Sequence, residues 1–328
     1  MINPDAPAFY EQHQDKLPRL FEIAGAPPEA AATLETAVEA TQPWVRGDHI
    51  KPEQRFQINP ADEPELHELY SQFGLVREHP LLARHYDELL MLGGTYWGNH
   101  HRMRFLKQVL EEGGITTDRV TLLGGERKIF TEEIVPVQDD LNNMGNGQLS
   151  NLEKGAGGTN IHWETDMLRL AAVMDLGNVV VEKAAAYMTE TGEYARPHIQ
   201  EFSWRDVPFA LMHAQAVERN GAARHTTESC MADWLETTGP KSEAVVGFIA
   251  ANPHTTRVAR SAYGVLRKYG RDDIALVPAG PAVLPTVKNH TYLGEIGRHL
   301  YEDMRLRQTG SGLAAGTGIS GEPSVIGQ

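Results

Sequence analysis

The stretch of this chain with the clearest chemical potential is Asn252-Pro253-His254-Thr255-Thr256-Arg257, which directly follows an apolar run at 245–250. A histidine exchanges a proton near neutral pH, and an arginine binds a carboxylate or phosphate with two hydrogen bonds. His254 and Arg257 are three residues apart across a predicted loop–helix junction, so both can face one ligand. The alternative is a buried histidine that satisfies loop carbonyls. We favour His254 as a catalytic residue and Asn252 and Arg257 as ligand-binding residues.

A second candidate stretch begins with Gly93-Gly94-Thr95, after an apolar run at 89–92. Glycines let a ligand approach the backbone closely, and free amides at the next helix start favour an anion. Asn99 is a candidate N-cap, and Arg102 follows in the first helical turn. The third glycine of the dinucleotide fingerprint is missing. A tight turn with a helix cap is the structural alternative to a ligand site.

A third stretch, Gly124-Gly125-Glu126-Arg127, follows the apolar run at 120–123. Glu126 is a candidate base, or a partner for a hydroxyl or ammonium group. Gly125 and Arg127 are candidate ligand-binding residues. A surface ion pair between the two charged residues explains the pattern equally well.

Two predicted helix starts carry further polar residues. The carboxylate of Glu164, a third candidate catalytic residue, lies in a first turn, where the helix dipole already explains it; a ligand contact is the other interpretation. Thr226 with Ser229 forms a partial capping box, because Glu or Gln is expected at the second position. Thr226, Thr227 and Glu228 are candidate ligand-binding residues, since hydroxyls and free amides can hold a phosphate or carboxylate.

Metal binding and a serine hydrolase triad are not supported by the motifs. Cys230 is the single cysteine, and no H-E-x-x-H or G-x-S-x-G motif is present. His100 and His101 are adjacent, so on a helix they point in different directions. We therefore predict no metal.

The charge balance bears on the partners. Lys and Arg number 30 against 44 Asp and Glu, which gives a net charge of −14. Such a balance disfavours a nucleic-acid binder. No apolar run is long enough for a membrane span, and no secretory signal is recognisable. We expect a cytoplasmic protein with a small-molecule substrate and no nucleic-acid or membrane partner, and we leave a homo-oligomer open.

These residues need a scaffold, and the apolar pattern predicts one. Apolar strand-like runs alternate with helix-period segments; the runs are 89–92, 120–123, 209–212, 245–250 and 274–277, and the helices are about 99–112, 163–176, 226–237 and 255–269. This order predicts an α/β fold with a mainly parallel sheet and helices on both faces. All the candidate loops then lie at the carboxyl edge of the sheet, where ligands bind.

Three segments are expected to lie outside this core. Residues 1–80 read as a helical extension or cap before a domain at 81–308. Residues 131–161 contain many Gly, Asn and Asp residues and read as a long flexible loop near the site. Residues 309–328 contain six glycines and read as a disordered tail.

The ordered set of loops resembles the YdcF/SanA-like proteins, over about residues 87–285. This resemblance implies a Rossmann-like core, and binding of S-adenosylmethionine is reported for a member of that family. It implies a pocket lined by Gly94, Arg102, Glu164, Thr226, Glu228, His254 and Arg257. The chain departs from the family pattern because Ser229 replaces an Asn, no membrane anchor is present, and residues 1–80 and 131–161 have no counterpart.

Three functions remain open. The first is an enzyme, preferably a transferase, that binds an anionic or nucleoside-containing molecule such as S-adenosylmethionine. Arg102 and Arg257 would hold the anion, while His254 and Glu164 would handle protons. The second is a hydrolase of a phosphorylated or amide-linked metabolite. The third is a ligand-binding sensor or assembly protein without catalysis.

Overall fold

The computed structural model describes residues 8–45, 58–125, 127–153, 159–177, 179, 199–214, 217–219, 222–224 and 226–312. Two compact units divide the chain. The sheet unit comprises the described residues of Tyr70–Val287, and the helical unit comprises the described residues before and after this range. Within the described segments, no helix is both long and apolar enough to cross a membrane.

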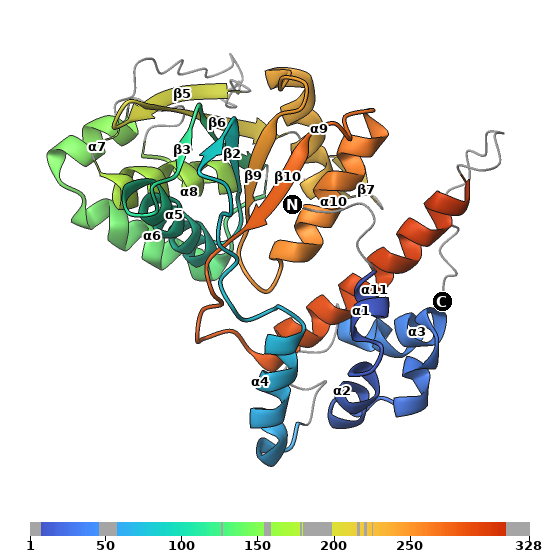
Figure 1. The fold of residues 1–328 in the computed structure, drawn as a ribbon. Coiled ribbons are helices and arrows are strands. Elements are labelled where there is room, and N and C mark those ends of the chain that lie inside the picture. Colours follow the sequence, from blue (N-terminus) through green and yellow to red (C-terminus); the bar gives the residue numbers. More distant parts are fainter. Residues whose placement is uncertain are drawn as a thin grey trace. The chain divides into compact units, whose positions relative to one another are not determined.

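The sheet unit is built on a mixed six-stranded sheet with the strand order β10-β9-β2-β4-β6-β5 (Figure 1). Its strands are β2 (Glu88–Leu92), β4 (Val120–Gly125), β5 (Ile199–Trp204), β6 (Val207–Ala214), β9 (Val245–Ile249) and β10 (Ala275–Ala279). Every pairing is parallel except that of β5 with β6. The predicted mainly parallel sheet is confirmed.

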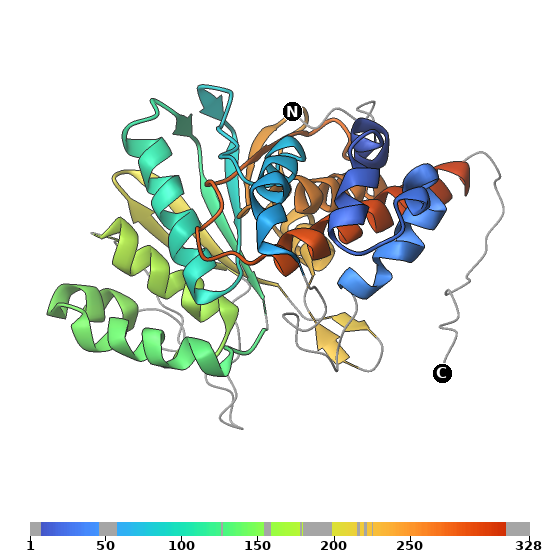
Figure 2. The same cartoon turned by 90° about the horizontal axis from the view of Figure 1, so that it is seen from below.

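Helices cover both faces of this sheet, as predicted (Figures 1 and 2). Leu89 and Met91 of β2 face α5 (Tyr96–Glu111) and α8 (Glu164–Ala171), which continues as a π-helical turn at Ala172–Leu176. Leu90 and Leu92 face α9 (Thr227–Thr238) and α10 (Thr255–Lys268). Because successive side chains of a strand point to opposite faces, an unbroken apolar run such as that of β2 supplies both cores.

The order of the strands changes direction at β2. The chain passes from β2 through α5 to β4 on one side, whereas β9 lies on the other side of β2 and leads through α10 to β10. Leu90 of β2 pairs with both Thr121 of β4 and Phe248 of β9. The loops after β2 and β9 therefore leave neighbouring strands toward opposite faces, which is the arrangement that leaves room for ligands in parallel sheets.

The range 131–161, expected to be a long loop, is mostly helical. It contains α6 (Thr131–Asn143) and α7 (Asn146–Glu153). Val137, Leu152 and Ile161 pack against Met167 and Leu170 of α8. The sequence predicted a loop because its many glycines were given more weight than this apolar pattern. The glycines at 155, 157 and 158 lie outside the described residues. Its predicted flexibility stays a prediction.

The edge strand β5 was not predicted. Arg205 and Asp206 join it to β6, and both residues have positive φ. A two-residue hairpin turn of this kind normally contains Asn or Gly, so Arg205 and Asp206 carried no recognisable turn signal. The remaining short strands are β1 (His85–Tyr86), parallel to β3 (Thr116–Thr117), and β7 (Val217–Arg219), antiparallel to β8 (Ala222–Arg224).

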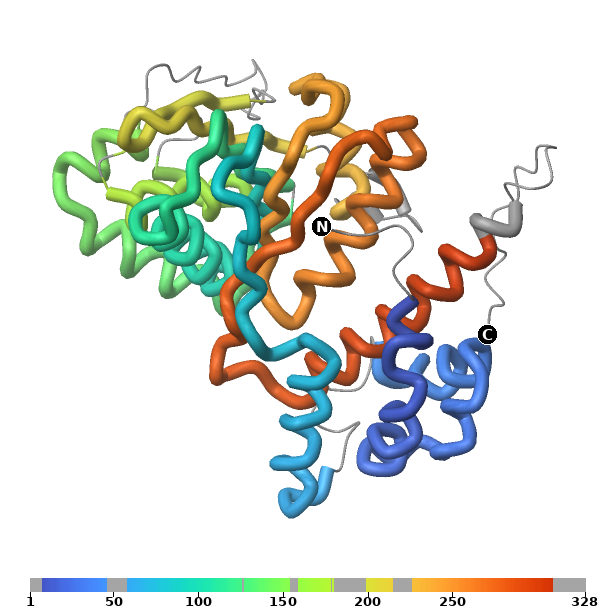
Figure 3. Tube along the Cα trace, in the orientation of Figure 1, coloured from blue at the N-terminus to red at the C-terminus, as the bar shows by residue number. Residues whose placement is uncertain are grey.

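The helical unit joins the beginning of the chain to its end (Figure 3). Its elements are α1 (Phe9–His13), α2 (Leu17–Ile23), the 3₁₀ turns Pro28–Ala32 and Pro60–Asp62, α3 (Leu34–Val45), most of α4 (Glu63–Gln72) and α11 (Asn289–Gly312). Gly297 of α11 packs so closely on α3 that an added Cβ would lie 2.7 Å from a methyl group of Val45. Because α11 ends at Gly312, residues 309–312 of the predicted disordered tail are helical. The rest of that tail lies outside the described residues.

Candidate functional site

The loop after β2 surrounds a buried arginine. Arg102 reaches back from α5 and donates hydrogen bonds to the carbonyl oxygens of Leu92 at 2.5 Å, Gly93 at 3.0 Å and Gly98 at 2.9 Å. Its residue is only 6% exposed. The three bonds fix the guanidinium group in place, so the loop and the arginine form one rigid unit.

The outer nitrogen of this guanidinium, Nη2, has no hydrogen-bond partner among the described residues. It lies against Gly94 and Gly98, where an added Cβ would collide with it. The pKa of Arg102 is lowered to about 10, mainly by burial; Glu164 opposes this change and Arg127 contributes to it. Since this pKa remains well above neutral, the group carries a buried positive charge with donors to spare at pH 7.

Asn99 does not cap α5 as expected. Thr95 is the N-cap, with its Oγ1 accepting a hydrogen bond from the amide of Gly98 at 3.3 Å. Asn99 lies one turn later, is fully buried, and donates from Nδ2 to the carbonyl oxygen of Gly94 at 3.2 Å. The helix therefore begins earlier than the apolar pattern indicated, and Asn99 anchors the glycine loop instead.

A cluster of three charged side chains adjoins this loop. Arg127, just after β4, donates to Gly94 O at 2.8 Å, to Glu133 Oε2 at 2.9 Å and to Glu164 Oε2 at 3.1 Å. Glu164 is 3% exposed and Glu133 is fully buried. Gly93 lets the loop approach this cluster closely, because an added Cβ at this position would collide with the carboxylate of Glu164. The structure thus brings together Gly93, Gly94, Arg102, Arg127 and Glu164, which are all candidate residues from the sequence analysis.

Glu133, which was not selected from the sequence, accepts a hydrogen bond from a backbone amide that was expected to bind the ligand. Its carboxylate accepts hydrogen bonds from the amides of Tyr96 at 2.8 Å and Phe130 at 2.6 Å. Burial would raise the pKa of Glu133, but the hydrogen bonds from Arg127 and from these amides lower it overall. The first amide of α5 is therefore occupied by an internal anion, so an incoming anion meets Arg102 rather than that amide.

The end of β6 adds a buried histidine that was not selected from the sequence. His213 is 7% exposed, and its Nδ1 lies 2.7 Å from Oγ1 of Thr165. It pairs in register with Gly124, at the end of β4. The apolar run ending at His213 was the only signal available, because its partner Thr165 lies on a different element.

The other predicted residues begin the helices that follow β8 and β9. Thr226 caps α9: its Oγ1 accepts from the amide of Ser229 at 3.2 Å, and Ser229 Oγ accepts from the amide of Thr226 at 2.9 Å. The serine therefore completes the capping box, while Thr227 and Glu228 form the first turn. Glu164 and Glu228 both raise the pKa of Cys230 in α9, although burial is the larger cause.

The junction between β9 and α10 carries Asn252, His254 and Arg257. Asn252 is 6% exposed and donates from Nδ2 to the carbonyl oxygen of Arg77. His254 immediately precedes α10, and Arg257 lies in its first turn. Because β9 neighbours β2, this junction flanks the loop of Gly93 and Gly94. The sequence-predicted Glu126 lies outside the described residues, while Gly125 ends β4 and accepts from Thr165 Oγ1 at 3.3 Å.

A cluster of charged and polar side chains around His100 joins α5 to α6 and to the π-helical turn. His100 Nδ1 lies 2.6 Å from Asp175 Oδ2, and its Nε2 lies 3.2 Å from Asp140 Oδ2. Tyr96 donates its hydroxyl to the same Asp140 oxygen at 2.8 Å, and Arg104 donates to Asp175 at 2.9 Å. The cluster fixes α6 and the π-helical turn against α5, and so supports the start of α5 at the site.

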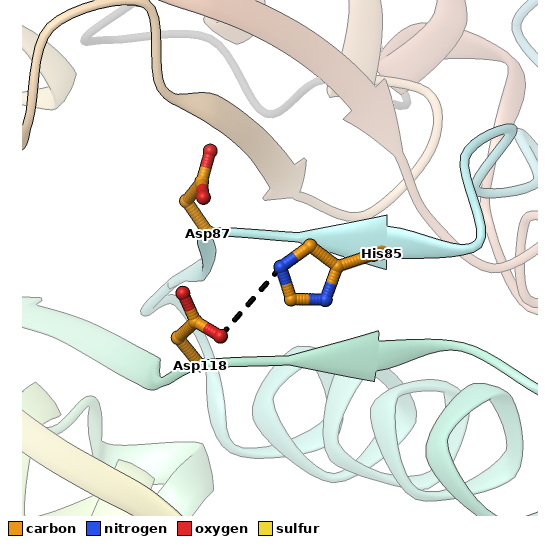
Figure 4. Close-up of side chains that lie close together, drawn as sticks. All are labelled: His85, Asp87 and Asp118. Carbon is orange, nitrogen blue, oxygen red and sulfur yellow. Dashed lines mark ion pairs between the residues drawn. The ribbon is translucent and has the colours of Figure 1, made fainter.

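A third group lies at the opposite, amino-terminal end of the strands (Figure 4). Ligand atoms of His85, Asp87 and Asp118 lie within 4.8 Å of one another, and His85 Nε2 is 3.6 Å from Asp118 Oδ1. Lys241 already pairs with Asp87, and His85 and Asp118 are exposed. Surface ion pairing accounts for this group.

No protein-family model matches the chain, and neither a curated protein nor a solved structure is significantly similar to it.

Proposed function

We propose that the sheet unit is a small-molecule enzyme that binds an anionic or nucleoside-containing ligand at the carboxyl edge of its sheet. The ligand's anionic group is held by Nη2 of Arg102. The carrying observation is that this nitrogen, the outer end of a buried and positively charged side chain, is fixed beside two glycines and has no hydrogen-bond partner among the described residues. Nη2 is not among the fully buried unpaired atoms, so a ligand can reach it, and a phosphate or carboxylate oxygen is the acceptor that a guanidinium group binds best.

The strand order supports a Rossmann-like fold as part of this proposal. When the parallel strands are followed outward from β2, the chain moves first to β4 and β6 and then to β9 and β10. Doubly wound nucleotide-binding sheets have this order, and their ligands lie where the order reverses. The proposed relation to the YdcF/SanA-like proteins draws on the positions of Gly94, Glu164 and His254 at this edge.

Within this proposal, Glu164 and His254 transfer protons, and Arg257 assists in binding the anion. Group transfer is the favoured reaction, with S-adenosylmethionine as a candidate ligand. Hydrolysis of a phosphorylated or amide-linked metabolite, with water activated by Glu164 or His254, is the alternative. A sensor or assembly protein differs from both, because it binds the ligand without turnover.

The test is a Gly98→Ala variant, studied by calorimetry with phosphate monoesters, nucleotides and S-adenosylmethionine. The added Cβ would lie 2.9 Å from Nη2, which the guanidinium's other hydrogen bonds hold in place. Alanine is favoured over glycine in a helix by about 1 kcal/mol, so the fold is expected to persist. We expect anion affinity to fall by at least about tenfold, the equivalent of one lost charge-assisted hydrogen bond.

Gly264→Ala is the matched control, because Gly264 is also helical and an added Cβ there meets nothing within 4 Å. It should bind anions like the unaltered protein. The proposal fails if the folded, unaltered protein binds none of these molecules, or if both alanine variants bind equally well. Binding without conversion of any ligand would favour the sensor.

A further inference from the structure

Resting on the proposed function, we propose that the same ligand carries hydroxyl groups, and that Asn99 and Asn252 accept hydrogen bonds from them. The substrate class is then a hydroxylated phosphate or carboxylate, such as a polyol or sugar phosphate. The inference comes from two buried amide oxygens at the point where the strand order reverses. It concerns specificity, which the binding of an anion by Arg102 alone does not provide.

The oxygen atoms Oδ1 of Asn99 and of Asn252 are both buried and have no hydrogen-bond partner in the part of the chain that the structure describes. Their residues are 0% and 6% exposed. Leaving a buried acceptor unpaired costs about 1–3 kcal/mol, and such groups are rare in folded proteins. Two of them, one in the first turn of α5 and one in the junction after β9, therefore indicate a bound group that supplies donors.

Both amides are oriented by the bonds that their nitrogens make. Asn99 Nδ2 donates to Gly94 O at 3.2 Å, and Asn252 Nδ2 donates to Arg77 O. Exchanging nitrogen and oxygen in either amide would place two acceptors against each other. The two oxygens are therefore presented as acceptors in fixed positions, and only a donor can satisfy them.

The two asparagines belong to one neighbourhood. The segments 76–79 and 280–283 pair through His79 with Gly280 and through Val283 with Val76. Asn252 bonds this pair of segments at Arg77, and His101 of α5 contacts Ala282 O at 2.7 Å. The start of α5, which carries Asn99, and the junction after β9 therefore adjoin the same paired segments.

The side chains that carry the unpaired donor and one of the unpaired acceptors, Arg102 and Asn99, both contact Gly94. Nη2 of Arg102 lies against Gly94, and Asn99 bonds the carbonyl oxygen of the same residue. A ligand that satisfies both needs an acceptor and a donor a short distance apart. A hydroxylated phosphate ester meets this requirement, because its anionic oxygens and hydroxyls are neighbours; neutral amide oxygens also suit neutral hydroxyls.

The experiment compares glycerol 3-phosphate with propyl phosphate, which differ in their two hydroxyl groups. Binding to the full chain is measured by calorimetry. We expect glycerol 3-phosphate to bind at least about tenfold more tightly, since a hydrogen bond to an otherwise unpaired buried group is worth about a factor of ten.

Substitutions at Asn252 separate recognition from structural support. Both Asn252→Leu and Asn252→Asp remove the bond to Arg77, but only Asp keeps an acceptor for the ligand. We expect the preference for glycerol 3-phosphate to disappear in Asn252→Leu and to persist in Asn252→Asp, whose charge weakens both probes alike. The same pair of substitutions at Asn99 should behave in the same way.

The outcomes distinguish the two proposals. If the unaltered protein binds no phosphate monoester, nucleotide or S-adenosylmethionine, the proposed function fails and the inference falls with it. If propyl phosphate and glycerol 3-phosphate bind equally, only the inference is overturned. Equal preferences in the Leu and Asp variants also overturn it, because they would show a purely structural role. Should the variants not fold, the comparison of probes on the unaltered protein still decides.

Discussion

Two buried glutamates of the sheet unit, Glu88 and Glu133, occupy opposite electrostatic environments. Glu133 receives Arg127 and two backbone amides, which together lower its pKa although burial opposes them. Glu88 lies at the start of β2 and contacts Thr121, Arg119 and Trp234 Nε1. There burial is the largest effect and raises the pKa of Glu88. The two residues should therefore make stability depend on pH in opposite directions.

Replacing Glu133 with Gln should destabilise the protein by about 3 kcal/mol at pH 7, because it leaves the buried side of Arg127 without its carboxylate. A carboxyl whose folded pKa is lowered stabilises the fold above its unfolded pKa, and that contribution disappears as the pH falls through the folded value. Urea unfolding of both proteins from pH 7 to pH 3 should show the difference shrinking below about pH 4.5, the ordinary glutamate value. A difference that stays constant would contradict this account.

Replacing Glu88 with Gln should have the reverse effect. A raised folded pKa means that protonated Glu88 suits its site, and that this stability is lost as the pH rises through the folded value. Glutamine resembles the protonated form, so Glu88→Gln should be more stable above that pH, by about 1.4 kcal/mol per unit of pKa difference. The gain should vanish toward pH 4 in the same unfolding experiment. Destabilisation at pH 7 would show that the ion pair with Arg119 outweighs burial.

At the scale of residues, the sequence predicted which residues take part in the site better than it predicted which residues they contact. Gly93, Gly94, Arg127 and Glu164 were selected from local patterns, and they do meet. Glu133 was not selected, because its role depends on Tyr96, which lies 37 residues away. Arg102 was expected to hold the anionic part of a ligand, whereas most of its donors bind backbone carbonyl oxygens. Local patterns contain no information on such distant contacts.

At the scale of elements, side-chain caps at the N-terminus help to determine where helices of the sheet unit begin. Thr226→Ala removes the hydroxyl that accepts from the Ser229 amide, and should cost about 1 kcal/mol. Thr256→Ala is a suitable control, because no hydrogen bond of its side chain is found among the described residues. Urea unfolding at pH 7 compares the two, and equal losses would show that capping is not responsible.

Apolar periodicity predicted the elements that build the sheet core, including β2, β9 and α10. It failed for α6, where Gly, Asn and Asp outweighed a weak apolar face, and for β5, whose turn consists of Arg205 and Asp206. Both failures have one physical cause. The stability of these elements comes from packing against α8 and β6, which a local reading does not include.

At the scale of the molecule, the described apolar clusters of the sheet lie wholly within Tyr70–Val287. A fragment comprising residues 70–287 should therefore fold alone, with mixed helix and strand signals in far-UV circular dichroism and one cooperative thermal transition. It should also retain the affinity of the full chain for phosphate monoesters. An unfolded fragment would show that the sheet unit depends on the rest of the chain.

The helical unit is assembled from both ends of the polypeptide, and Tyr10 of α1 bonds Asp303 of α11 at 2.7 Å through its amide. During synthesis its first three helices leave the ribosome well before α11 exists. Until α11 is made, Phe9 lacks the His299 ring on which it stacks, Tyr10 lacks Asp303, and Val45 lacks the close contact with Gly297, while the whole sheet unit is translated and folds. Ribosomes stalled shortly after residue 287 should thus carry a finished sheet beside an amino-terminal segment that is still sensitive to protease.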